Sequence, residues 1–229
     1  MPDSVIPKDE QEIPKKVKAI SLRILVAALI FLLAIAIFTL IANEMVLENE
    51  NGLDKRAFSE LSAITNPLMT RIMTIITFFG SSYFLGPSYL ILIIYFLVIK
   101  KNRRMSLDIA AFGILGGIIL FSLKAIFHRH RPLDPLIQNV NGFSFPSGHS
   151  FSAFTFFGLL IYIIWNQNIN PSLRWILTIL FFLFACAIAF SRIYLHVHYA
   201  SDVVAGFLLC IVWLVASFWI LKKFSKILS

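Results

Sequence analysis

The chain contains several long stretches without a charged side chain, and these restrict its fold more than any other feature. The clearest runs from Ile24 to Asn43, twenty residues in all. Twenty residues of α-helix rise about 30 Å, which matches the hydrocarbon thickness of a bilayer. Backbone polar groups in lipid must be satisfied internally, and a helix does this within one segment. Because 59% of the residues are hydrophobic and only 14% are charged, we predict an all-α integral membrane protein.

The run Ile24–Asn43 is predicted to be an uncleaved first span. A secretory signal peptide has an apolar region of roughly 7–15 residues, followed by small residues at a cleavage site. This run is longer, and no such site follows closely before the acidic residues. Residues 1–22, which mix acidic and basic side chains, are then a cytoplasmic tail.

The segment before the second span contains signals for a separate helix. Asn66-Pro67 fits a helix start, because Asn caps free N–H groups and Pro is tolerated at the first position. Gly80-Ser81-Ser82 and Gly86-Pro87 interrupt a charge-free stretch that is too long for one plain span. We expect an amphipathic interfacial helix at about 66–79. The six predicted spans are about 24–43, 83–99, 107–127, 149–165, 173–191 and 200–221, in one domain over 23–222 with a cytoplasmic tail at 223–229.

The distribution of Lys and Arg predicts how these spans are oriented. With the N-terminus inside, thirteen Lys and Arg lie on the cytoplasmic side and seven on the other. Cytoplasmic segments of membrane proteins carry such an excess, so both termini are predicted to be cytoplasmic. Orientation also accounts for the net charge of +8, and no nucleic-acid partner is expected. The sequence leaves the oligomeric state open.

Three polar clusters interrupt the apolar pattern, at Lys124–Pro132, Pro146–His149 and Ser191–Asp202. They fall at the end of the third predicted span, the start of the fourth, and the turn between the fifth and sixth. All three therefore lie on the extracytoplasmic side of the predicted topology. Ionisable residues at the edge of apolar segments are costly, so they indicate a functional site.

Three long cations, Lys124, Arg131 and Arg192, are predicted to bind an anion together with the start of the fourth span. A helix N-terminus offers free N–H donors, and Gly148, beside Ser147, lets the backbone come close to a ligand. Two guanidinium groups and an ammonium group suit a phosphate or an oxyanion of similar shape. The alternative is that these cations reach the interface and contact lipid headgroups.

His198 and Asp202 are four residues apart, which on a helix places them on one face. The carboxylate would then hold one imidazole nitrogen and leave the other free as a nucleophile. His149, at a helix start, would give a proton to a leaving oxygen. The other histidines are expected to form hydrogen bonds at the interface: His128, His130 and His196.

Metal-free chemistry is favoured by the shortage of acidic residues. A hydrolytic two-metal centre usually needs several carboxylates. After residue 100 the acids are Asp108, Asp134 and Asp202, and Asp108 falls on the cytoplasmic side. No metal and no cofactor are therefore expected, and a histidine-only zinc site is the alternative.

The three clusters together resemble the motif of the type 2 phosphatidic acid phosphatase (PAP2) superfamily, K-x6-RP, PSGH and SR-x5-H-x3-D. Every position of the motif is matched, by Lys124, Arg131, Pro132, Pro146 to His149, Ser191, Arg192, His198 and Asp202. The resemblance implies a metal-independent phosphatase of a membrane lipid phosphate, in the cytoplasmic membrane of a bacterium.

The resemblance also implies roles for the site residues. His198 would form a phosphohistidine, Asp202 would orient it, and His149 would protonate the leaving oxygen and later activate water. The phosphate oxygens would be held by Lys124, Arg131, Ser147, Gly148 and Arg192.

Several alternatives remain at this level. The substrate could be undecaprenyl diphosphate, phosphatidylglycerophosphate or phosphatidate. A lipid phosphotransferase of the same family would differ in its acceptor, an alcohol in place of water. Vanadate haloperoxidases resemble the same motif, but they are soluble. A lipid-binding or transport protein would carry polar residues throughout its spans, whereas here they gather at one face.

Overall fold

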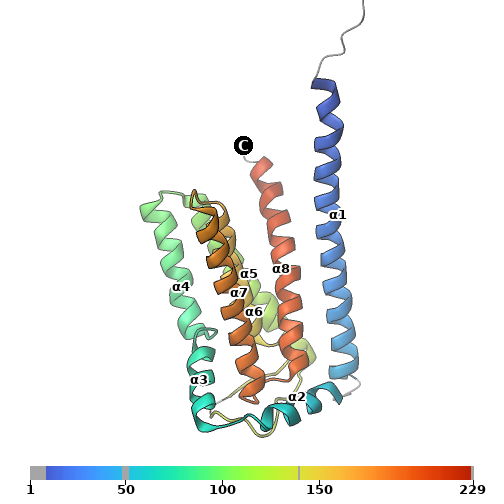
Figure 1. Ribbon diagram of the computed structural model, residues 1–229, viewed down its shortest axis with the longest axis vertical. Helices are drawn as coiled ribbons and strands as arrows, with labels where there is room; N and C mark the ends of the chain where they lie inside the picture. The colour runs from blue at the N-terminus through green and yellow to red at the C-terminus, as the bar shows by residue number, and fades with distance from the viewer. Residues whose placement is uncertain (1–8, 48–51, 139, 228–229) are drawn as a thin grey trace, which may run out of the picture.

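A computed structural model describes residues 9–47, 52–138 and 140–227 of the chain. These residues form helices and loops, with no strand among them. Figure 1 shows a bundle of upright helices with one short helix across its lower end. The helices are α1 (Asp9–Ile41), α2 (Gly52–Ser62), α3 (Pro67–Phe78), α4 (Ser82–Ile94), α5 (Arg103–Phe127), α6 (Gly148–Trp165), α7 (Pro171–Tyr194) and α8 (Ala200–Ile227), with π-helical segments at Ala42–Leu47 and Tyr95–Ile99.

Six helical segments are long and apolar enough to cross a membrane, which confirms the predicted all-α architecture. They are Ile24–Glu44, Pro67–Ile99, Arg103–Phe127, Gly148–Trp165, Pro171–Tyr194 and Ala200–Ser217. The outermost helices are longer than predicted: α1 begins inside the expected tail 1–22, and α8 continues into the expected tail 223–229. Residues 1–8 and 228–229 of those tails lie outside the described residues. The cytoplasmic location of both termini stays a prediction.

The separate helix expected at 66–79 is present as α3. The Asn66 side chain accepts a hydrogen bond from the Met69 N–H at 2.9 Å, with Pro67 in the first turn. The break between α3 and α4 falls at Gly80, where a Cβ atom would lie 2.5 Å from the Ile188 side chain of α7. Figure 1 shows α3 standing below α4, while the helix that lies across the lower end of the bundle is α2, which the sequence reasoning did not predict.

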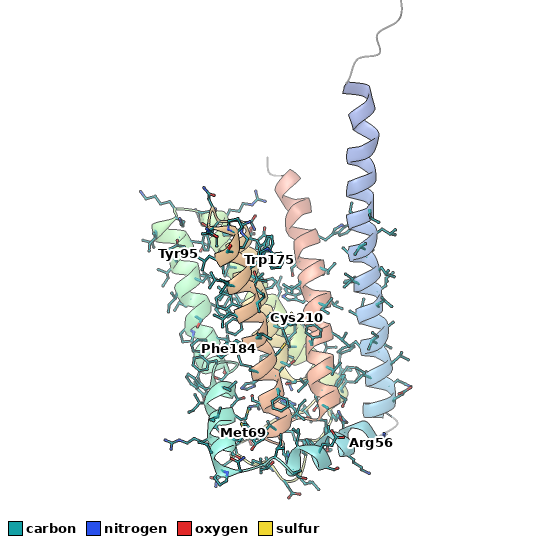
Figure 2. The ribbon with its side chains drawn as sticks, viewed as in Figure 1. Arg56, Met69, Tyr95, Trp175, Phe184 and Cys210 are labelled. Atoms are coloured by element: carbon teal, nitrogen blue, oxygen red, sulfur yellow. The ribbon has the colours of Figure 1, made fainter. Side chains whose placement is uncertain are left out.

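Helix α6 lies at the centre of the bundle, because it contributes side chains to two separate apolar clusters. Phe151 packs with residues of α5 and α8, including Trp213. Phe157 packs with residues of α4 and α7, among them Phe184, which Figure 2 shows between these helices. Helix α1 stands at the edge beside α8 and exposes many of its apolar side chains, which suits contact with lipid.

A single glycine sets how closely α8 approaches the start of α6. A Cβ atom at Gly206 would lie 2.7 Å from the Ser147 carbonyl oxygen and 3.1 Å from the Phe151 nitrogen. A larger residue would force the two helices apart. The close contact brings the first turn of α8, which carries Asp202, against the N-terminus of α6.

Candidate active site

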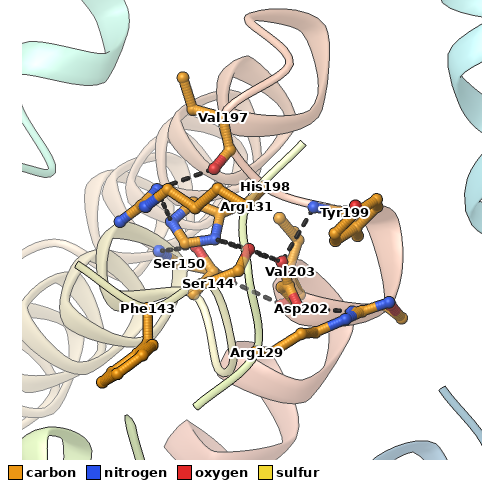
Figure 3. A network of polar contacts seen from close by, with 12 residues as sticks. Arg129, Arg131, Phe143, Ser144, Ser150, Val197, His198, Tyr199, Asp202 and Val203 are labelled. Atoms are coloured by element: carbon orange, nitrogen blue, oxygen red, sulfur yellow. Dashed lines mark hydrogen bonds and ion pairs between the residues drawn. The ribbon is translucent and has the colours of Figure 1, made fainter. Parts of the chain in front are cut away.

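The three polar clusters predicted from the sequence meet at the lower end of the bundle in Figure 1. The C-terminus of α5, the N-terminus of α6 and the turn between α7 and α8 come together there. The loop after α5 closes over them, with the Ser144 N–H bonded to the Arg129 carbonyl at 2.8 Å. Figure 3 shows this meeting point, with His198 and Asp202 surrounded by residues of the loop.

His198 is held by contacts on both ring nitrogens. Its Nδ1 lies 3.3 Å from Asp202 Oδ2 and 3.2 Å from Ser144 Oγ. Its Nε2 lies 3.1 Å from Nη1 of Arg131, which donates to it. With an acceptor pair at Nδ1 and a donor at Nε2, the proton belongs on Nδ1 and the lone pair on Nε2. The nitrogen that remains nucleophilic therefore faces a guanidinium.

The imidazole is kept neutral by its surroundings. Only 1% of His198 is exposed, and burial lowers its pKa from 6.5 to about 3. The hydrogen bond and the negative charge of Asp202 raise the pKa of His198, while the positive charges of Arg131 and Arg192 lower it further. A neutral imidazole has the lone pair that a nucleophile needs.

The spacing of four residues predicted that His198 and Asp202 share one face of a helix. The two residues are in contact, but the shared helical face is wrong. His198 precedes α8, which begins at Ala200. The turn is closed instead by the Tyr199 N–H, which donates to Asp202 Oδ2 at 2.9 Å. The residue before this turn, Val197, also binds Arg131, whose Nη1 donates to its carbonyl at 2.7 Å.

Asp202 is fully buried and bonded on both oxygens. The Ser144 hydroxyl donates to Oδ2, and Arg129 Nη1 donates to Oδ1 at 2.6 Å. Neither partner was assigned from the sequence: Ser144 precedes the second cluster by two residues, and Arg129, although it lies inside the first cluster, was given no role in the site. The only available signal was their place beside motif residues, which does not distinguish a partner from a neighbour.

The three predicted anion-binding cations have neutral partners. Lys124 Nζ donates to the Phe143 carbonyl at 2.7 Å. Arg131 Nε donates to the Gly142 carbonyl at 2.9 Å. In the described part of the chain, no ion pair involves Lys124, Arg131 or Arg192.

Arg192 is the most isolated of the three. It is 4% exposed, and its Nη1 donates to Thr77 Oγ1 of α3 at 2.6 Å. Its Nε is buried without a hydrogen-bond partner. Thr77 was not identified from the sequence, because its segment carries no motif. The Nε–H donor of Arg192 is therefore not used by any of the described residues.

The start of α6 contributes differently at its three predicted residues. Ser147 is buried and caps the helix, with its Oγ accepting from the Ser150 N–H at 3.4 Å. Its own N–H donates to the Asp202 carbonyl at 2.9 Å. Gly148 and His149 line a cavity. The break before α4 packs on this histidine, because a Cβ at Gly80 would lie 3.2 Å from its ring.

The cavity has a volume of about 640 Å³ and joins the polar site to the apolar space between α4 and α5. Its polar end is formed by Lys124, Arg131, Gly148, His149 and His198. Its apolar part is bordered by Gly86, Tyr89, Gly113, Gly116, Gly117, Leu120 and Phe121. The glycines leave this space open, and at Gly86 and Gly117 no atom lies within 4 Å of a Cβ position. A headgroup and a hydrocarbon tail would fit such a cavity together.

The remaining histidines lie away from this cavity. His128 ends α5 in a left-handed conformation (φ 48°), and its Nδ1 is 3.2 Å from the Ile126 carbonyl. His196 also has a positive φ of 54° and packs on Phe58, with ring centroids 4.8 Å apart. His130 is exposed. In the described residues, no three His, Cys, Asp or Glu side chains are grouped as metal ligands, and independence of metal stays a prediction.

The sequence profile of the PAP2 superfamily matches residues 105–226. The chain belongs to the PAP2 superfamily. Phosphatidylglycerophosphatase B of Bacillus subtilis is 30% identical over 165 residues, which cover 71% of this chain and 78% of that protein. Dolichyldiphosphatase of Saccharomyces cerevisiae is 32% identical over 138 residues, covering 56% of this chain and 57% of the relative.

A solved structure also has the fold of this PAP2 protein. The crystal structure of a transmembrane PAP2-type phosphatidylglycerolphosphate phosphatase from Bacillus subtilis superposes with a TM-score of 0.73 at 25% identity, covering 87% of this chain and 97% of that one. The profile match spans α5 to α8. Asp54 and Thr77, which bond to Arg129 and Arg192, lie before it.

Proposed function

We propose that this chain hydrolyses a lipid phosphomonoester or diphosphate without a metal ion, through a phosphohistidine on His198. The coarser statement, that it is a membrane lipid phosphatase of the hydrolase class, rests on its superfamily and on relatives named as phosphatases. The finer statement rests on the site. Its single strongest support is that Arg131 contacts the Nε2 of a neutral, buried histidine at the polar end of the cavity, where Lys124 also lies and neither cation has an ion pair within the described residues.

The geometry supports a two-step displacement. His198 Nε2 attacks phosphorus, so that an N–P bond forms and the bond from phosphorus to the leaving oxygen breaks. Asp202 holds the Nδ1 proton and stabilises the positive charge that develops on the ring. His149, which lines the same cavity, gives a proton to the leaving oxygen.

The second step reverses these roles. His149 takes a proton from water, the water oxygen attacks phosphorus, and the N–P bond breaks to release inorganic phosphate. In both steps Lys124 and Arg131, which border the cavity, stabilise negative charge on the phosphoryl oxygens. Arg192, buried beside Thr77, is proposed to add a third positive charge. Ser147 and Gly148 complete the phosphate-binding set through the N-terminus of α6.

The substrate is proposed to be a lipid with its tail between α4 and α5. The cavity bordered by Gly86 and Gly117 continues from the phosphate site into this apolar space. Relatives named for phosphatidylglycerophosphate and dolichyl diphosphate support both a phospholipid and an isoprenoid carrier. The substrates to compare are therefore undecaprenyl diphosphate, phosphatidylglycerophosphate and phosphatidate.

The site is proposed to face the extracytoplasmic side of a bacterial cytoplasmic membrane. The excess of Lys and Arg at the termini and at Lys100–Arg104 supports cytoplasmic termini. The site lies at the opposite end of the bundle from the start of α1. A bacterial relative supports the compartment.

The experiment is release of phosphate by the detergent-purified protein in EDTA, from each of the three lipids. We expect release from at least one, and loss of turnover in His198→Ala, which still folds as shown by its unfolding temperature. Substantial turnover by His198→Ala would refute the nucleophile, and dependence on added metal would refute the metal-free step. Phosphate transfer to an added lipid alcohol, without release, would identify a phosphotransferase instead.

A further inference from the structure

A buried ion pair lies directly behind the carboxylate that holds His198. Asp54 of α2 and Arg129 of the loop after α5 are 1% and 8% exposed. Arg129 Nη2 lies 2.9 Å from Asp54 Oδ2, while its Nη1 donates to Asp202 Oδ1 at 2.6 Å. One guanidinium therefore joins two carboxylates with two different nitrogens, and Figure 3 shows the contact with Asp202.

The start of α8 fixes the other end of this ion pair. The Ser201 N–H donates to Asp54 Oδ1 at 2.9 Å, and its hydroxyl donates to Oδ2 at 2.7 Å. The same hydroxyl accepts from Arg129 Nη1 at 2.8 Å. The guanidinium also lies over the Tyr199 ring, with Cζ 4.2 Å from its centroid. Both carboxylate oxygens of Asp54 thus accept hydrogen bonds, and the contacts on the Arg129 guanidinium fix its position.

We propose that Asp54 and Arg129 are positioning residues for the reaction, acting on His198 through Asp202. Because Arg129 engages Oδ1, the carboxylate of Asp202 is held with Oδ2 toward the histidine Nδ1. The imidazole then keeps its Nε2 directed at the phosphate site. This inference rests on the proposed function, in which His198 is the nucleophile.

Arg129 differs from Arg131, which is proposed to bind phosphate, in its carboxylate partners and in its position relative to the cavity. Arg129 contacts two carboxylates and does not border the cavity. Arg131, two residues along the same loop, forms no ion pair with a carboxylate of the described residues, faces His198 and borders the cavity. A guanidinium neutralised from two sides is poorly suited to bind phosphate, but its planar fork is well suited to orient a carboxylate.

The first test compares kcat with KM in variants of this pair. Asp54→Asn keeps the shape of the side chain and removes its charge. It should lower kcat by about 10- to 100-fold, the range known for the loss of carboxylates that orient metal-bound histidines from behind. KM should stay near the wild-type value, because the cavity is unaltered. Arg129→Lys should recover part of the activity lost in Arg129→Gln. The matched control is Glu60→Gln, the same chemical change at an exposed position of α2, which should leave kcat unchanged.

The second test does not need phosphatase activity. Diethyl pyrocarbonate acylates neutral imidazole nitrogen, and mass spectrometry gives its rate at each histidine. Asp54→Asn should slow the reaction at His198 several-fold, about in proportion to the loss in kcat, and leave exposed His128 unaffected. His128 serves as the reference within the same molecule.

The two readouts separate the inference from the proposed function. If the wild type releases no phosphate, the proposed function fails, and labelling of His198 alone decides the inference. Unchanged kcat and unchanged labelling of His198 in Asp54→Asn would overturn the inference. A lower unfolding temperature with full activity per folded molecule would also overturn it, because the ion pair would then serve stability alone. If Asp54→Asn does not fold, Arg129→Lys, which keeps the charge, is judged by the same readouts.

Discussion

Replacing Arg192 by methionine is expected to stabilise the protein while it removes activity. The side chain is 4% exposed, has one hydrogen bond to Thr77 through Nη1, and has a buried Nε without a partner. No carboxylate in the described residues pairs with it. A buried unpaired charge costs several kcal/mol, and a buried unsatisfied donor about 1–3 kcal/mol. Arg192→Met removes both costs and keeps a long side chain in place.

The gain in the free energy of unfolding should be about 1–3 kcal/mol, which lies within the range of about 1–4 kcal/mol found when buried ion pairs are replaced by apolar residues. For a chain of this length, that corresponds to a rise of about 2–12 °C in unfolding temperature. In the same variant kcat/KM should fall about 10²- to 10³-fold, because the proposed function uses Arg192 as a donor to the transition-state oxygens. Stability and activity should therefore change in opposite directions.

The assay is thermal unfolding in detergent with and without inorganic phosphate, together with phosphate release from the lipid. At a phosphate concentration 100 times its Kd, the wild type should gain about 2.7 kcal/mol and the variant much less. Arg71→Met, at an exposed position of α3, is the control and should change neither quantity. A variant that is less stable than the wild type, or that keeps full activity, would refute the reasoning.

Three further predictions follow from the site. His149→Ala should lower turnover of an alkyl phosphate more than that of an aryl phosphate, whose leaving group needs less protonation, and equal losses would argue against an acid role. Gly117→Leu should lower kcat/KM about 10-fold or more for a long-chain lipid but not for a short-chain ester, since this glycine borders open cavity; similar losses on both would contradict the tail site. Burial keeps the pKa of His198 at about 3 in the folded protein against 6.5 when unfolded. The unfolded chain therefore binds more protons between these values, and stability should fall as pH is lowered from 6.5 towards 3. The free energy of unfolding, measured with urea at a series of pH values, should depend less steeply on pH in His198→Gln than in the wild type. An identical pH dependence would count against the burial effect.

The parts of the site that could be predicted are those whose chemistry is visible in local sequence. Lys124, Arg131 and His149 stand at the ends of apolar runs, where an ionisable side chain needs a reason. Asn66 and Pro67 mark a helix start by their own hydrogen bonding and φ preference, and α3 begins there. Such signals act within a few residues, so one sequence is enough to read them.

The parts that were missed depend on contacts between distant segments. Asp54 reaches Ser201 across 147 positions, and Thr77 reaches Arg192 across 115. Neither belongs to a pattern, and the helix that carries Asp54 lies in a polar segment that gave no apolar run to recognise. Ser147 shows a related limit, because a serine before a helix is equally suited to cap it or to bind a ligand. The structure shows the cap.

The arrangement of charge around His198 gives each cation its task. Arg129 and Arg131 lie two residues apart, yet one meets two carboxylates and the other meets carbonyl oxygens and an imidazole nitrogen. The carboxylates stand behind the histidine, where they neutralise the cation that holds Asp202. In front of it the cations have only neutral partners, so their charge remains available to a ligand. A site built to stabilise the empty state would pair all of these charges. The unpaired ones on the cavity side are therefore best explained by an anion that the site is built to receive.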